Sequence, residues 1–279
     1  MVQSKIQAPS FQGMVAANGI EVYAERAGQG ELLFYIGGTG GDLRNRPNIF
    51  DSLLGQRFDI LTYDQRGLGR SGKPSGAYAM ADYADDAAAV MDHIGIAQAK
   101  VMGVSFGGMV AQEFALRHPH KVSALVLSCT SPGGQGGSSF PLHTLEALPA
   151  EERIRRHLKI SDTRRTDAWI AEHPDTWEAL LERSRKARRP DRHVEGAMQQ
   201  LHARIGHDTF DRLGEIRAPV YLAGGEFDDI APPRNMRALA KAIPNAELRL
   251  YQGGHLFMVQ DPAAYPDIAR WLEAQLPAR

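Results

Sequence analysis

The sequence of 279 residues contains a single cysteine, Cys129. One thiol cannot form a disulfide within the chain, and it excludes a metal site built from several cysteines. This scarcity fits a reducing compartment. Cys129 ends a predicted strand and has no base close to it in the sequence. We therefore expect a small buried or pocket-wall side chain at this position and no catalytic thiol.

The chain also lacks an excess of either charge and any long apolar run. Its 32 Lys and Arg and 33 Asp and Glu residues give a formal net charge of −1, whereas a general nucleic-acid binder usually has a basic excess. No stretch reaches the roughly 18 apolar residues of a membrane helix. The N-terminal "MVQSKIQAPSFQG" lacks the apolar segment of a signal peptide. We expect a cytoplasmic protein that acts on a small molecule, without nucleic-acid or membrane partners; the oligomeric state stays open.

A glycine-rich stretch, "YDQRGLGRSGKPSG", raises the possibility of a nucleotide site. Gly67, Gly69 and Gly72 match G-x-G-x-x-G, and the same stretch nearly matches a P-loop. A P-loop requires Ser or Thr after the lysine, where this chain has Pro74. A dinucleotide loop leads directly into a helix, but residues 74–76 intervene before the next helical pattern. We interpret the stretch as a tight turn after a strand and expect no cofactor, which argues against a dinucleotide-dependent reductase.

The order of elements along the chain predicts an α/β fold. Two short runs flank Asn18-Gly19, the favoured turn of a β-hairpin. Six further β-rich runs alternate with segments that have apolar residues at helical spacing. Together they predict an eight-stranded, mostly parallel sheet flanked by helices. The six runs are "LLFYIG", "FDILTYD", "AKVMGVS", "KVSALVLSC", "PVYLAGG" and "AELRLYQGG".

Residues 131–206 interrupt this alternation because they contain no good strand pattern. The segment opens with the glycine-rich "SPGGQGGSSFP" and continues with arginine-rich helical patterns. We expect a helical insertion after the sixth strand. The predicted organisation is a core of residues 1–130 and 207–279 with a helical cap of residues 131–206.

The motif "GVSFG" places Ser105 between a predicted strand and a predicted helix, the context in which G-x-S-x-G presents a nucleophile. A residue at such a sharp turn has a strained backbone, and its neighbours two positions away must lack a Cβ. Gly103 and Gly107 meet that requirement. The turn also directs the N–H of Phe106 into the site, where it can stabilise an oxyanion.

A serine nucleophile needs a base and an acid that orients the base. Both types of residue follow later predicted strands. The stretch "PVYLAGGEFDDIAPP" contains Asp228 and Asp229, and "AELRLYQGGHLFMVQDP" contains His255. The order serine, aspartate, histidine is the one found in enzymes whose serine lies on a strand-to-helix turn.

These motifs together resemble the α/β-hydrolase fold over nearly the whole chain. "YDQRGLGRSG" is similar to the family's D-x-R-G-x-G-x-S loop, and "GVSFGG" to its nucleophile elbow. "GEFDDIAPP" and "GGHLFMVQDP" resemble its acid and histidine loops. The resemblance implies a Ser105-Asp228-His255 triad, with Asp229 in a position that is often proline. The predicted insertion lies where the family has its helical cap.

One loop departs from the family pattern. The family usually has His-Gly-x after the third strand, where x donates the second oxyanion N–H. This chain has "FYIGGTGGD", so that glycine replaces the histidine. The alignment makes Thr39 the donor, and a shift by one residue makes it Gly38. Because the donor is a backbone N–H, we expect a working oxyanion hole in either case.

The resemblance and the serine nucleophile favour hydrolysis of a small carboxylic ester or lactone through an acyl-enzyme on Ser105. Dehalogenases and most epoxide hydrolases of this fold have aspartate at that position. C–C bond hydrolysis and cofactor-free peracid formation use the same triad and remain alternatives. A ligand receptor with a hydrolase-like pocket is an alternative from another class. Phe257, Trp169 and Trp177 are candidate pocket residues, although the tryptophans could instead pack the cap. We expect no metal.

Overall fold

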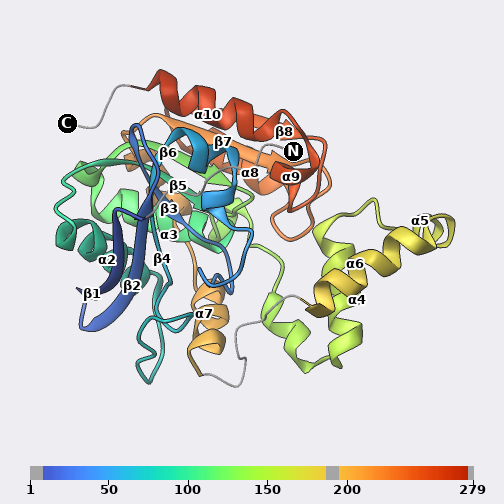
Figure 1. Ribbon diagram of the computed structural model, residues 1–279. Helices are drawn as coiled ribbons and strands as arrows, with labels where there is room; N and C mark the ends of the chain where they lie inside the picture. The colour runs from blue at the N-terminus through green and yellow to red at the C-terminus, as the bar shows by residue number, and fades with distance from the viewer. Residues whose placement is uncertain (1–8, 187–194, 276–279) are drawn as a thin grey trace.

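The computed structural model describes residues 9–186 and 195–275, and its centre is one eight-stranded sheet (Figure 1). Its strand order is β1-β2-β4-β3-β5-β6-β7-β8. The strands are β1 (Phe11–Ala17), β2 (Ile20–Ala27), β3 (Leu32–Ile36), β4 (Asp59–Tyr63), β5 (Ala99–Val104), β6 (Val122–Ser128), β7 (Val220–Gly225) and β8 (Ala246–Tyr251).

The pairing of the strands confirms the predicted, mostly parallel sheet. β1 pairs antiparallel with β2, and β2 pairs antiparallel with β4, while all other pairs are parallel. The turn of the first hairpin is Asn18-Gly19, with φ of 47° and 80°. Both residues of a type I′ turn need a positive φ, which explains the Asn-Gly sequence.

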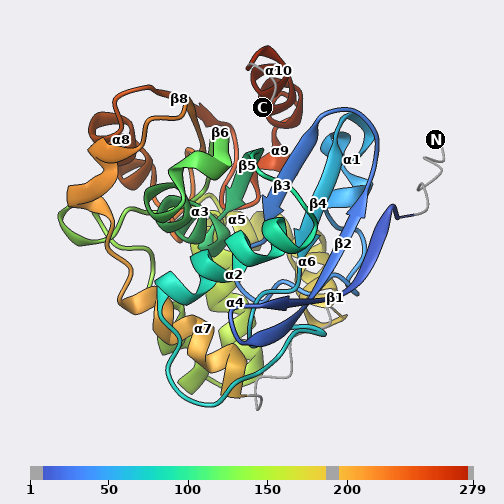
Figure 2. The ribbon, with the colours of Figure 1, turned by 90° about the vertical axis from the view of Figure 1, so that its left-hand side faces the viewer.

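Helices cover both faces of the sheet. Leu33 and Phe34 are consecutive residues of β3 and lie in different apolar clusters, one on each face. One face is covered by α2 (Met80–His93), α3 (Phe106–Arg117) and α8 (Pro233–Ala242), and Figure 2 looks onto α2 and α3. The other face is covered by α1 (Leu53–Arg57), α9 (Phe257–Gln260), α10 (Ala264–Ala274) and the 3₁₀ helix η1 (Ile49–Asp51). No helix among the described residues has the length and apolar character needed to cross a membrane.

Between β6 and β7, the described residues form helices joined by loops and contain no strand. Ile154, Leu158, Trp177 and Leu181 form a separate apolar cluster within this segment, and α4, α5 and α6 extend to the right of the sheet in Figure 1. The elements are η3 (Gly134–Gly136), η4 (Leu142–Ala147), α4 (Ala150–Ser161), α5 (Asp167–Glu172), α6 (Pro174–Lys186) and α7 (Glu195–Ile205), followed by η5 (Phe210–Glu215).

The two ends of this helical segment lie side by side. Gly133 and Asp208 form an isolated antiparallel bridge. The N–H of Thr209 donates to the carbonyl of Pro132 over 2.9 Å. Nε2 of the buried His207 lies 3.0 Å from the carbonyl of Ser131. These contacts form a stem that fixes where the segment leaves and rejoins the sheet.

The glycine-rich stretch after β4 serves close packing. Gly67 has φ of +79°, and a Cβ at this position would lie 2.7 Å from the carbonyl oxygen of Gly196 in α7. The next helix, α2, begins only at Met80. The stretch therefore does not lead into a helix N-terminus, as a dinucleotide loop would.

Candidate active site

Ser105 lies at the junction of β5 and α3 with φ of 56° and ψ of −117°. This region of backbone conformation is rarely adopted by residues with a side chain, so the turn is strained. A Cβ on Gly103 would lie 2.3 Å from the carbonyl oxygen of Gly107. A Cβ on Gly107 would lie 2.1 Å from the carbonyl oxygen of Ile36. Only glycine fits at either position, which is the physical basis of the G-x-S-x-G motif here.

A chain of hydrogen bonds joins Ser105 to two residues that are distant in the sequence. The Oγ of Ser105 lies 3.0 Å from Nε2 of His255. The Nδ1 of His255 lies 2.7 Å from Oδ2 of Asp228. Because an ionised carboxylate only accepts, Nδ1 carries the proton and donates to Asp228. The lone pair of Nε2 then faces the serine hydroxyl, as a general base requires.

The three hydrogen-bonded side chains are largely shielded from solvent. Ser105 is 7% exposed, and the side chains of His255 and Asp228 are 14% and 0% exposed. The second carboxylate oxygen of Asp228 accepts the N–H groups of Ile230 and Ala231 at 2.8 and 3.0 Å. Together with His255, these bonds use both oxygens of the carboxylate and fix its orientation.

The neighbouring Asp229 does not reach His255. It is exposed, and its N–H donates to the carbonyl of Ile160 at the end of α4 over 3.0 Å. Of the two aspartates that follow β7, only Asp228 is hydrogen-bonded to the imidazole.

The loop after β3 lies directly beside Ser105. A Cβ on Gly38 would lie 3.5 Å from the Cβ of Ser105. Phe106 is the first residue of α3, so its N–H belongs to a helix N-terminus, which favours a negative charge. Gly38 and Thr39 are consecutive in this loop, and their roles as alternative second donors stay predictions.

Three polar side chains hold this loop, and sequence reasoning did not find them. Gln65, Gln200 and Arg204 contact Gly37, Gly40 and Thr39, respectively. The only sequence signal is weak: Gly196, Gln200 and Arg204 are spaced four residues apart and therefore share one face of α7.

The predicted pocket aromatics are not part of the hydrogen-bonded chain. Phe257 is fully buried and stacks on Tyr251 with ring centroids 5.1 Å apart. Trp177 is buried in the apolar cluster of α4 and α6. Trp169 packs against that cluster and stacks on His173. Cys129 is 1% exposed, and burial raises the pKa of its thiol.

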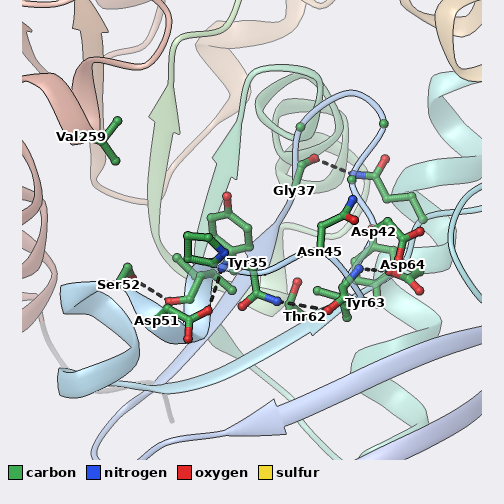
Figure 3. A pocket seen from close by; sticks show the side chains of 18 of the residues that line it. Tyr35, Gly37, Asp42, Asn45, Asp51, Ser52, Thr62, Tyr63, Asp64 and Val259 are labelled. Carbon is green, nitrogen blue, oxygen red and sulfur yellow. Dashed lines mark hydrogen bonds between the residues drawn. The ribbon is translucent and has the colours of Figure 1, made fainter. Parts of the chain in front are cut away.

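A cavity of about 580 Å³ borders the other part of the loop after β3. Tyr35 and Gly37 line it, and Figure 3 shows Val259 of α9 apart from the other labelled lining residues. Its lining includes Gly37, Gly38, Gly40 and Gly41, but none of Ser105, Asp228 and His255. Across the part of the chain that is described, no group of three or more His, Cys, Asp or Glu side chains is placed to hold a metal.

Comparison with known proteins identifies the family. The family model of the alpha/beta hydrolase fold matches residues 31–262. The chain therefore belongs to the α/β-hydrolase family, and the predicted fold and family are confirmed.

The relatives differ in the reactions that their names describe. The chain is 29% identical over 232 residues to a poly(3-hydroxyalkanoate) depolymerase of Ectopseudomonas oleovorans, covering 81% of this chain and 79% of the relative. It is 30% identical over 257 residues to the putative carbamate hydrolase RutD of Caulobacter segnis, covering 87% and 91%. The crystal structure of the enol-lactonase from Burkholderia xenovorans LB400 has the same fold, with a TM-score of 0.73 at 21% identity over 94% of this chain and 100% of that one.

Proposed function

We propose that this protein is a serine hydrolase that cleaves a small carboxylic ester or lactone through an acyl-enzyme on Ser105. The observation that carries the proposal is the hydrogen-bonded chain from Ser105 through His255 to Asp228, which begins at a strained turn. This arrangement supplies a nucleophile, a base and a group that orients the base.

In the first half of the reaction, the Oγ of Ser105 attacks the substrate carbonyl while Nε2 of His255 takes the hydroxyl proton. Asp228 stabilises the imidazolium that forms. The negative charge that develops on the carbonyl oxygen is stabilised by the N–H of Phe106 and by one N–H of the loop after β3. When the tetrahedral intermediate collapses, the bond between the carbonyl carbon and the leaving oxygen breaks, and His255 donates its proton to that oxygen.

In the second half, His255 takes a proton from water, and the resulting hydroxide attacks the acyl group on Ser105. Collapse of the second tetrahedral intermediate releases the carboxylic acid and regenerates the serine hydroxyl. With a lactone, the complete reaction releases one hydroxy acid, because the leaving oxygen stays attached to the acyl group.

An ester substrate is supported by the name of the poly(3-hydroxyalkanoate) depolymerase among the relatives. Because another relative is named a putative carbamate hydrolase, carbamates are the alternative substrate class to test beside esters. A panel of p-nitrophenyl esters of increasing chain length, simple lactones and an aryl carbamate separates these classes. We expect the esters or lactones to have the highest kcat/KM.

We propose further that the segment of residues 131–206 is a cap on a core of residues 1–130 and 207–279. The end of α4 touches both loops that hold the acid and the histidine. The carbonyl of Ser161 accepts the N–H of His255 over 2.6 Å, and the carbonyl of Ile160 accepts the N–H of Asp229. At the other end of the segment, α7 contacts the loop after β3.

The direct test is Ser105→Ala. The variant should fold normally and lose ester turnover by several orders of magnitude, because no other nucleophile replaces the hydroxyl. Ser128→Ala is the matched control, since Ser128 is also buried and ends the adjacent strand β6. Turnover in folded Ser105→Ala at a rate near that of the wild type would refute the proposal.

A further inference from the structure

The loop after β3 has too few side chains for its own packing to fix its conformation. Residues 37–40 are Gly-Gly-Thr-Gly, so three of the four have no side chain to pack and have wide conformational freedom. All three glycines also border the cavity of about 580 Å³. Because close packing is what normally fixes a backbone segment, a segment beside a cavity depends more strongly on its hydrogen bonds.

Two buried glutamines supply such bonds at both ends of the loop. The Nε2 of Gln65 donates to the carbonyl of Gly37 over 2.6 Å. The Oε1 of Gln200 accepts the N–H of Gly40 over 2.9 Å. The Nε2 of Gln200 donates to Oε1 of Gln65 over 3.1 Å, which joins the two contacts into one chain. Gln65 and Gln200 are 3% and 1% exposed, so breaking these bonds would leave buried polar groups without partners, which is costly.

Arg204 adds a third contact from the same helix. Its Nη1 donates to Oγ1 of Thr39 over 3.1 Å, and its Nε donates to Oγ of Ser139 over 2.9 Å. The side chain is 6% exposed, and its Nη2 has no hydrogen-bond partner among the described residues. Burial lowers the pKa of Arg204 to about 10, which leaves it protonated at neutral pH. A buried cation therefore lies beside the loop and is hydrogen-bonded to Thr39.

The helix that provides Gln200 and Arg204 is itself fixed against the core. A Cβ on Gly196 of α7 would lie 2.4 Å from Cα of Gly67 in the loop after β4. Contact between two backbones without intervening side chains leaves little freedom for α7 to shift. The position of α7 therefore determines where Gln200 holds Gly40.

We propose that Gln200 and Gln65 are positioning residues that set the oxyanion hole by holding residues 37–40 beside Ser105. The inference rests on the proposed function, since it assigns these glutamines to the same site. It also gives α7 a part in catalysis beyond covering the site, because the second oxyanion donor is in place only when α7 is docked.

Loss of a positioning bond should act mainly on the transition state. Removing an oxyanion donor outright lowers kcat by about 10²- to 10³-fold, so displacing one should cost about 10- to 100-fold. An interaction made only in the transition state lowers kcat and kcat/KM together and changes KM little. The affinity for an aryl trifluoromethyl ketone, which binds serine hydrolases as an oxyanion, should fall in parallel with kcat/KM.

The experiment uses Gln200→Met, Gln65→Met and the double variant in the full chain. Methionine keeps the length and volume of glutamine and removes both polar atoms. Gln112→Met is the matched control, because Gln112 is a fully buried glutamine in α3 whose amide donates to the carbonyls of Gly108 and Ser131 and not to the loop. Each protein is assayed for thermal unfolding, for kcat and KM with a p-nitrophenyl ester, and for the Ki of the trifluoromethyl ketone.

We expect each single Met variant of Gln65 and Gln200 to lose about 10- to 100-fold in kcat, with KM within about threefold of the wild type. Because the two side chains are hydrogen-bonded to each other and act together, the double variant should resemble the worse single variant. Gln112→Met should keep its kcat. If the Met variants do not fold, Gln200→Asn, which shortens the side chain by one methylene, is tested with the same expectation.

The proposal is overturned if folded variants of Gln65 and Gln200 keep kcat within about threefold, or if Gln112→Met loses as much as they do. Failure of the proposed function looks different, because it appears as turnover that survives Ser105→Ala. Failure of the positioning role alone appears as Ser105-dependent turnover that the glutamine variants leave intact.

Discussion

At the scale of single residues, two adjacent carboxylates have opposite environments. Asp228 is buried and bonded to His255, whereas Asp229 is exposed and donates its backbone N–H to the carbonyl of Ile160 at the end of α4. Replacing Asp228 by Asn keeps the shape of the side chain but favours the wrong tautomer of His255.

We therefore predict a fall in kcat of about 10³- to 10⁴-fold for Asp228→Asn, the size of the effect in a serine protease. Asp229→Asn should change kcat by about tenfold or less and is the matched control. The measurement is steady-state turnover of the best ester of the panel. The opposite ranking of the two variants would assign the acid to Asp229.

A functional residue can be predicted from the sequence when the element that contains it fixes its position, and not when distant elements must pack to place it. Ser105, Asp228 and His255 each follow a strand of a parallel sheet, so their side chains must meet at one edge, and the glycines around Ser105 report a local steric requirement. Gln65, Gln200 and Arg204 come together only through the docking of α7 on the loop after β4. No pattern within one element encodes that docking, apart from the shared face of α7.

At the scale of elements, the stem of the helical segment contains a titratable group. Nε2 of His207 donates to the carbonyl of Ser131, while its Nδ1 is buried without a partner among the described residues. Burial lowers the pKa of His207 from 6.5 to about 4. The unfolded chain therefore binds more protons than the folded one between about pH 4 and 6.5. The contribution of His207 to stability is complete above pH 6.5 and is lost as the pH falls through this range.

We predict that the free energy of unfolding of the wild type decreases by up to about 3 kcal/mol from this residue alone between pH 6.5 and 4. His207→Gln has no such group, so its stability should fall less steeply with acidification. Urea unfolding at a series of pH values measures both curves, with the exposed His120→Gln as the control. Parallel curves for the wild type and His207→Gln would show that His207 does not titrate as inferred.

The elements themselves were predictable to different degrees. The Asn-Gly turn and the β-rich runs predict all eight strands, because each run is bounded by turn residues. The helical nature of the segment after β6 also follows from its spacing of apolar residues. The 3₁₀ helix η3 within the glycine-rich loop could not be predicted from the sequence. Its glycines fit closely against Phe210, Pro132 and Asp208, and the contacts of the stem place these residues there.

At the scale of the whole molecule, the sheet and the helical segment meet at one site. Ser105, Asp228 and His255 follow strands of the sheet, while α4 and α7 contact the loops beside them. Because the two sets of elements come from different parts of the chain, a complete site requires the whole fold. For this site we propose that Ser105 is a nucleophile activated by His255.

The measurement that tests this claim most directly is covalent labelling with a fluorophosphonate, followed by mass spectrometry of the intact protein and of its peptides. We predict one adduct per chain, located on Ser105, formed far more slowly in His255→Ala and absent in Ser105→Ala. Ser128→Ala should be labelled like the wild type. An adduct on another residue, or ester turnover by a protein that takes up no label at Ser105, would show that Ser105 is not the activated nucleophile.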